Sequence, residues 1–81
     1  MRQSIFISGA AQGIGAAIAR LFYQQGYKVG IYDLNETLAQ QLAEQLGPHA
    51  RAGRLDVCAY ASWQTALQDF NTWTGQVNLL I

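Results

Sequence analysis

Three glycines between an apolar run and a helix-patterned stretch constrain the fold of this chain more than any other feature. Gly9, Gly13 and Gly15 lie between Ile5–Ser8 and the stretch from Ile14 to Gln25. The first glycine lets a buried strand turn sharply with a positive φ, the second lets backbone N–H groups approach a phosphate, and the third lets the helix pack closely on the strand. The helix N-terminus then attracts the anion. This arrangement predicts a nucleotide phosphate-binding turn, and a glycine-rich connection without a ligand is the alternative.

Strand and helix patterns alternate along the 81 residues. Short apolar runs predict strands that are buried on both faces of a parallel sheet, at Ser4–Ser8, Lys28–Asp33, Ala52–Asp56 and Val77–Ile81. The succession βαβαβαβ, with right-handed crossovers, predicts an α/β fold. This would be the first half of a doubly wound parallel sheet with strand order 3-2-1-4.

The helical stretches each predict one buried face. The expected apolar positions are Ile14, Ala17, Ile18, Leu21 and Phe22 in the first helix, Leu38, Ala39, Leu42, Ala43 and Leu46 in the second, and Trp63, Ala66, Leu67, Phe70 and Trp73 in the third. Asn35 is the expected N-cap of the second helix, which should stop at Gly47-Pro48, and Gly75 should close the third. The aromatic side chains of the third helix are therefore expected in the core.

The spacing of the glycines indicates which class of dinucleotide site this is. Ser8-Gly9-Ala10-Ala11-Gln12-Gly13-Ile14-Gly15 is G-x-x-x-G-x-G. It resembles the Thr-Gly-x-x-x-Gly-Ile-Gly turn of the short-chain dehydrogenase/reductase family, with Ser8 in place of the usual Thr. The Gly-x-x-Gly-x-x-Gly turn of extended relatives, which act on nucleotide sugars, fits less well.

Three further segments carry the same resemblance, which thus covers essentially the whole chain. Asp33 ends the second predicted strand 18 residues after Gly15, close to the spacing of about 20 expected for the acid that binds the adenosine ribose. Asp56-Val57 resembles the family's Asp-Val pair at the end of the third strand. Val77–Ile81 resembles its fourth strand.

The resemblance implies a Rossmann-type domain of which residues 1–81 form the N-terminal part. The rest of that single NAD(P)-binding domain is then absent from this chain. It also implies an NAD-dependent oxidoreductase that transfers hydride between nicotinamide and a secondary alcohol or ketone. The family's acid/base pair, Tyr-x-x-x-Lys, lies beyond the fourth strand and does not occur here, so no catalytic residue is expected within 1–81. The alternative is a non-catalytic dinucleotide-binding sensor or regulatory module.

Asp33 favours NAD over NADP as the cofactor. Its carboxylate can accept hydrogen bonds from the free ribose hydroxyls and would repel a 2′-phosphate. NADP-selective relatives often place Arg or Lys where this chain has Gln12 and Leu34. By resemblance, Asp56 meets the adenine amino group, and the backbone of Val57 lines the adenine pocket. Helix capping is the alternative role for both acids. The expected cofactor-binding residues are Gly9, Gln12, Gly13, Ile14, Gly15, Asp33, Leu34, Asp56 and Val57.

Composition excludes several other classes of function. Hydrophobic residues make up 51% of the chain, charged residues 12%, and the net charge is zero, as in soluble globular proteins. Scattered basic residues argue against a nucleic-acid partner, and no apolar run is long enough to span a membrane. Without a secretory signal, a cytoplasmic location is expected. Neither the lone His49 nor the single cysteine, Cys58, predicts a metal site; Cys58 is a tolerated or a reactive thiol. A small-molecule substrate is expected, and by resemblance a homo-oligomer.

Overall fold

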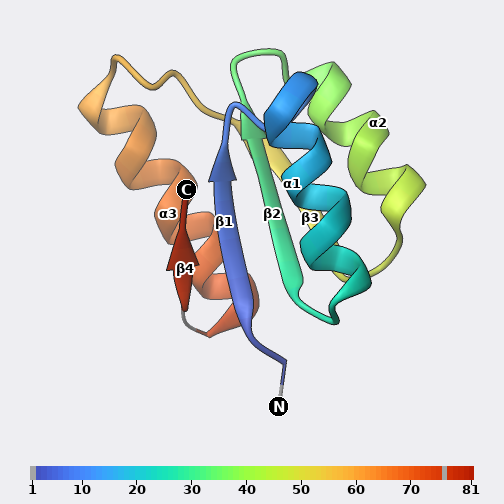
Figure 1. The fold of residues 1–81 in the computed structure, drawn as a ribbon. Helices are drawn as coiled ribbons and strands as arrows, with labels where there is room; N and C mark the ends of the chain where they lie inside the picture. The colour runs from blue at the N-terminus through green and yellow to red at the C-terminus, as the bar shows by residue number, and fades with distance from the viewer. Residues whose placement is uncertain (1, 76) are drawn as a thin grey trace.

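Four parallel strands form one sheet, with a helix between each pair of successive strands (Figure 1). The computed structural model describes residues 2–75 and 77–81. Its elements are β1 Ser4–Ser8, α1 Gly13–Gln24, β2 Lys28–Asp33, α2 Glu36–Leu46, β3 Ala50–Arg54, α3 Tyr60–Thr74 and β4 Leu79–Leu80. The strand order is β3-β2-β1-β4, so the predicted α/β class and the order 3-2-1-4 are confirmed.

Two strands match their predicted bounds and two do not. β1 and β2 begin and end at the predicted residues. β3 lies two residues earlier than the predicted Ala52–Asp56, because its pairing with β2 runs from Ala50 opposite Val29 to Arg54 opposite Asp33, where β2 itself ends. β4 is shorter than the predicted Val77–Ile81, since only Leu79 and Leu80 pair in register with β1.

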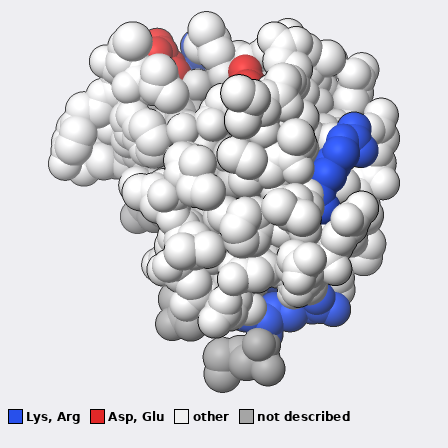
Figure 2. All heavy atoms as spheres, viewed as in Figure 1, with Lys and Arg blue, Asp and Glu red and all other residues white. Residues whose placement is uncertain are grey.

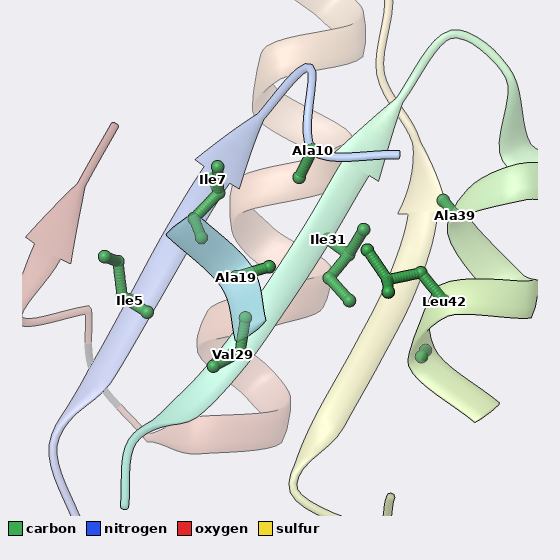
Figure 3. Close-up of a cluster of buried hydrophobic side chains, with 9 residues drawn as sticks. Ile5, Ile7, Ala10, Ala19, Val29, Ile31, Ala39 and Leu42 are labelled. Carbon is green, nitrogen blue, oxygen red and sulfur yellow. The ribbon is translucent and has the colours of Figure 1, made fainter. Parts of the chain in front are cut away.

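The helices cover both faces of the sheet and make three layers, with α1 and α2 on one face and α3 on the other (Figure 1). Side chains of a strand alternate between the two faces. Figure 3 shows buried side chains of the core between the sheet and the helices α1 and α2, among them Ile5, Ile7, Ala10, Ala19, Val29, Ile31, Ala39 and Leu42. The opposite face buries Phe6, Tyr32, Leu55, Ala66 and Phe70.

The buried face of α1 agrees with the predicted one only in part. Ile14 is 82% exposed and Leu21 52% exposed, and Ala17 is exposed as well. The predicted Ile18 and Phe22 do pack against the core, together with Ala16, Ala19 and Tyr23, which the prediction did not include. The physical reason is that Gly15, where α1 approaches the turn most closely, shares one helix face with Ala19 and Phe22, so this face is turned toward the sheet.

The other two helices bury the predicted faces. In α2, Ala39, Leu42 and Ala43 are buried. In α3, Phe70 is fully buried, and Trp63 and Trp73 are partly buried against the same cluster. The Phe70 ring lies directly on the sheet, because a Cβ on Gly30 would be 2.6 Å from Phe70 Cδ1. The core or helix-packing role predicted for Trp63, Phe70 and Trp73 is therefore confirmed.

A hydrogen-bonded network joins β2, β3 and α3 at the edge of the sheet. The Tyr32 hydroxyl donates to Asp69 Oδ2 at 2.7 Å, and the Arg51 guanidinium donates to both Asp69 oxygens at 2.9 and 2.7 Å. Burial, followed by the bond to Asp69, raises the pKa of Tyr32 above its usual value. The hydrogen bond from Arg51 lowers the pKa of Asp69.

Candidate functional site

The glycine turn between β1 and α1 lies at the carboxyl end of the sheet, where ligands of open α/β sheets bind. Gly9 and Gly13 have φ values of 63° and 64°, in the left-handed region that costs other residues about 1–2 kcal/mol. The Gly9 N–H donates to the Tyr32 carbonyl at 2.8 Å and ties the turn to β2. The positive φ at Gly9 matches the predicted reason for a glycine there.

The turn is closed on its inner side and open on its outer side. A Cβ on Gly15 would lie 2.8 Å from the Ala10 Cα and closer still to the Gly9 carbonyl oxygen, whereas a Cβ on Gly9 or Gly13 would meet nothing within 4 Å. Gly15 therefore permits the close packing of α1 that the sequence predicted. Gly13 leaves space in front of the first helical turn.

The N-terminus of α1 offers free hydrogen-bond donors to that space. The first N–H groups of a helix have no acceptor within the helix. Gln12 is the N-cap residue, but its side chain makes no capping bond. In α2, by contrast, Asn35 Oδ1 accepts from the Leu38 N–H at 3.1 Å, which confirms the predicted N-cap. The exposed side chain of Ile14 lies beside the open amides of α1.

Asp33 ends β2 beside the turn, and backbone amides hold its carboxylate. Oδ2 accepts from the Ala11 N–H at 3.1 Å, and Oδ1 accepts from the Asn35 N–H at 2.9 Å. Asp33 is therefore not the cap of α2, because Asn35 caps that helix. Its oxygens instead connect the glycine turn to the turn that precedes α2.

A hollow of about 640 Å³ opens next to Asp33. Its lining combines apolar, polar and charged residues from the end of β2, the connection that follows it, the first turn of α2 and the end of β3: Asp33, Leu34, Asn35, Glu36, Thr37 and Arg54. Leu34 is 60% exposed there. Figure 2 shows that the acidic side chains visible on this face lie at the end toward which β1 and β2 point.

Sequence reasoning missed Arg54 as a residue of this hollow. Arg54 pairs in register with Asp33, and its guanidinium makes no ion pair with any residue that the structure describes. The predicted β3, Ala52–Asp56, would have placed Asp56 and not Arg54 at the end of the strand, so the position of Arg54 depends on the register that the structure shows. The sequence pattern predicted only that Arg54 is part of a strand.

Asp56 and Val57 follow β3 and lie in the connection to α3. Asp56 Oδ1 accepts from the Cys58 N–H at 3.0 Å, and the Asp56 N–H donates to Ser62 Oγ at 2.9 Å. Asp56 thus stabilises the approach to α3, whose N-cap residue is Ala59. The Val57 side chain is 56% exposed, and its carbonyl accepts from Trp63 Nε1 at 2.9 Å.

The structure brings the glycine turn and Asp33 into direct contact, and it places Asp56 two residues beyond the end of the neighbouring strand β3. The Leu55 N–H donates to the Asp33 carbonyl at 3.0 Å, so the ends of β2 and β3 are also joined. Within residues 2–75 and 77–81, no three His, Cys, Asp or Glu side chains form a group suited to a metal ion. Nor is any helix in these ranges long and apolar enough to cross a membrane.

Residues 3–81 match the family model described as short chain dehydrogenase. The chain belongs to the short-chain dehydrogenase/reductase family. The resemblance inferred from the glycine turn and the strand ends is therefore confirmed.

Known members of the short-chain dehydrogenase/reductase family show how much of the chain is shared. A 3-beta-hydroxysteroid dehydrogenase of Comamonas testosteroni is 33% identical over 75 residues, which are 93% of this chain and 30% of that protein. A mouse (Mus musculus) 3-oxoacyl-(acyl-carrier-protein) reductase is 35% identical over 75 residues, 93% of this chain and 32% of the relative. This chain thus spans about a third of the length of these relatives.

Solved structures of short-chain dehydrogenases/reductases have the same fold. A 3-ketoacyl-(acyl-carrier-protein) reductase of Brucella melitensis, complexed with NADH, superimposes with a TM-score of 0.94 at 29% identity, over 96% of this chain and 32% of its own. A hydroxysteroid dehydrogenase of Escherichia coli superimposes with a TM-score of 0.90 at 30% identity, over 96% of this chain and 34% of its own.

Proposed function

We propose that the protein is an NAD-dependent oxidoreductase in which residues 1–81 supply the adenosine and pyrophosphate site. The observation that carries this proposal is the open glycine turn at the N-terminus of α1, held against the Asp33 carboxylate at 3.1 Å. The NADH complex of a reductase with the same fold supports a nicotinamide dinucleotide as the cofactor. The bound nicotinamide would supply hydride chemistry, and this segment would bind and orient the other half of the molecule.

The pyrophosphate would lie against the glycine turn. Gly9, Gln12, Gly13, Ile14 and Gly15 surround the open N-terminus of α1, where amide donors and the helix dipole favour negative charge. The space in front of Gly13 fits this group, since a Cβ there would project into it. A larger side chain at position 13 would occupy room that the phosphates need.

The adenosine would occupy the hollow beside Asp33. An ionised carboxylate offers about four acceptor positions, and the Ala11 and Asn35 amides use two of them. The others remain for ribose hydroxyls, whereas a 2′-phosphate would meet like charge. This supports NAD rather than NADP. Leu34, Asp56 and Val57 would border the adenine.

The reaction proposed for the whole protein is the interconversion of a secondary alcohol and a ketone. Its relatives include dehydrogenases and reductases that are named for steroid, dihydrodiol and acyl-carrier substrates, and this range supports a small-molecule substrate. We assign no catalytic residue within 1–81, and the acid/base pair is proposed to lie in the rest of the protein. A cytoplasmic homo-oligomer without a nucleic-acid or membrane partner completes the proposal.

Replacing Asp33 tests the cofactor assignment. In the full-length protein, Asp33→Ala is expected to weaken NAD binding by about 1.5–3 kcal/mol, the range for a hydrogen bond to a charged group, and to reduce discrimination against NADP. Titration calorimetry and steady-state kinetics with both cofactors measure the two effects. Glu36→Gln is the matched control, because it removes another carboxylate charge from the same hollow and should change the preference little. A wild-type enzyme that prefers NADP would contradict the assignment.

Arg54 provides a second variant for the same experiment. Arg54 lies opposite Asp33 in the register between β2 and β3. Once Asp33 is removed, the unpaired Arg54 guanidinium is the cation expected to bind a 2′-phosphate. The affinity of Asp33→Ala for NADP should therefore fall when Arg54→Gln is added. If the wild-type protein binds NAD but turns over no alcohol or ketone, the sensor alternative gains support instead.

A further inference from the structure

We infer that Asp33 is also a positioning residue, which holds the glycine turn in its binding shape before any cofactor arrives. The contacts of Asp33 within the protein do not depend on the proposed function. Their consequence for cofactor binding rests on that function. The carboxylate bridges the Ala11 amide, 22 residues earlier in the chain, and the Asn35 amide, two residues later. One side chain thus joins two loops that both border the candidate site.

Ala11 lies in the centre of the turn, between the two glycines with left-handed φ values. Such a turn has few local restraints of its own, because glycine has the widest choice of backbone conformations. The Gly9 N–H fixes its beginning on the Tyr32 carbonyl, and the Ala11 N–H fixes its middle on Asp33. Asp33 therefore helps to orient the open amides of α1.

The other end of the bridge is firmly held. Asn35 donates its N–H to Asp33 and accepts the Leu38 N–H with its side chain, so the first turn of α2 anchors the carboxylate. Only a carboxylate presents two acceptor oxygens to two amides in this way. An asparagine at position 33 has almost the same shape but only one acceptor oxygen, and its NH₂ group would face one of the two N–H donors.

The two roles of Asp33 make different predictions for a ligand without ribose hydroxyls. 2′,3′-Dideoxyadenosine diphosphate carries adenine and a diphosphate but offers no hydroxyl to Asp33. If Asp33 only recognises hydroxyls, Asp33→Asn leaves the affinity for this probe unchanged or raises it, since a negative charge is removed. If Asp33 positions the turn, Asp33→Asn weakens the binding of this probe as well as the binding of ADP. The positioning role thus predicts that a substitution of Asp33 made to change the cofactor preference also lowers the affinity for the diphosphate group.

Amide hydrogen exchange in the cofactor-free, full-length protein tests the positioning role directly. In the wild-type protein, the Ala11 amide is expected to exchange at least about tenfold more slowly than an unprotected amide, as a hydrogen bond to a charged acceptor implies. In Asp33→Asn this protection should fall by about the same factor. The Val29 amide, bonded to the His49 carbonyl at 2.9 Å within the sheet, reports whether the fold is kept.

Asp56→Asn is the matched control for exchange. It alters a carboxylate in the connection between β3 and α3 that accepts from the Cys58 amide and does not contact the glycine turn, so protection at Ala11 should not change. An unprotected Ala11 amide in the wild-type protein, or equal protection in Asp33→Asn, would overturn the inference. The inference would also be overturned if the Asp33→Asn variant bound the dideoxy probe as tightly as the wild-type protein, or more tightly. Failure of the proposed function would look different, because the wild-type protein would then bind neither ADP nor NAD while the exchange result still decided the role of Asp33.

Discussion

Gly9, Gly13 and Gly15 occupy one turn, yet each is glycine for its own physical reason. Gly9 and Gly13 have φ values of 63° and 64°, which penalise any side chain through the backbone. Gly15 lies so close to Ala10 that a Cβ would collide with the backbone of the turn. Gly13 is the first residue of α1 and leaves open space around a Cβ, so a substitution there tests ligand exclusion apart from packing.

Gly13→Val is expected to abolish dinucleotide binding in the full-length protein while the fold is kept. The branched side chain would fill the space proposed for the pyrophosphate, and the left-handed φ adds a strain of about 1–2 kcal/mol. Titration calorimetry with NAD measures the binding, and circular dichroism the fold. Gly75→Val is the control, since Gly75 has a φ of 88° and open space, but closes α3 away from the turn. Unchanged NAD affinity in Gly13→Val would mean that the turn is purely structural.

At the scale of elements, α3 is held to the sheet by an aromatic cluster and by one polar link. Phe6 stacks on Tyr32 with ring centroids 4.5 Å apart, and Phe70 packs edge-on against Phe6. The Tyr32 hydroxyl and the Arg51 guanidinium both bond to Asp69 of α3. Arg51 and Asp69 remain 42% and 38% exposed, so solvent screens their attraction and the aromatic cluster contributes more to the packing.

The contribution of Asp69 to stability should depend on pH. Because the hydrogen bond from Arg51 lowers the folded-state pKa of Asp69, its stabilisation is fully present above the unfolded pKa of about 3.9 and is lost as the pH falls through the folded value. Asp69→Asn is therefore expected to cost about 0.5–1 kcal/mol of unfolding free energy at neutral pH, and less near pH ~2.5. Urea titrations of the full-length protein at both pH values measure this. Glu44→Gln, at an exposed carboxylate, is the control, and a cost for Asp69→Asn that does not change with pH would contradict the prediction.

For the molecule as a whole, β4 is the strand that the described structure covers least, since both of its residues are exposed. Leu79, Leu80 and Ile81 are 40%, 55% and 50% exposed, although the Ile81 N–H and carbonyl both bond to β1. An exposed apolar strand edge favours association with further strands. The relatives are about three times as long as this chain, which leaves ample chain in a whole family member to cover such an edge.

Residues 1–81 made as a separate polypeptide are expected to lack both dehydrogenase activity and strong cooperative unfolding. A chain of this size buries only about 60–65% of the surface that it exposes when unfolded, and the exposed apolar side chains of β4 reduce that further. No acid/base pair for the nicotinamide is assigned within it. A urea titration followed by circular dichroism, with an NADH-linked assay over alcohols and ketones, measures both properties. A monomer that unfolds cooperatively and turns over any of these compounds would contradict both arguments.

The sequence by itself determined the order of elements, the class of turn and the family. These features are local, because they depend on residues a few positions apart, such as the glycine spacing, the Asn35 cap or the apolar period of α2. Asp33 was identified at the end of β2 for the same reason: a short apolar strand that stops at an acid is visible in a single stretch of sequence.

Only the tertiary structure decided how these parts meet. The close approach at Gly15 rotates α1 so that Ile14 and Leu21 face outward, which periodicity alone could not show. The bond between Asp33 and Ala11, the place of Arg54 in the hollow and the link from Tyr32 to Asp69 all join residues far apart in the chain. Such contacts depend on strand register and helix rotation. Both are set by packing over the whole sheet rather than by the preferences of any one segment.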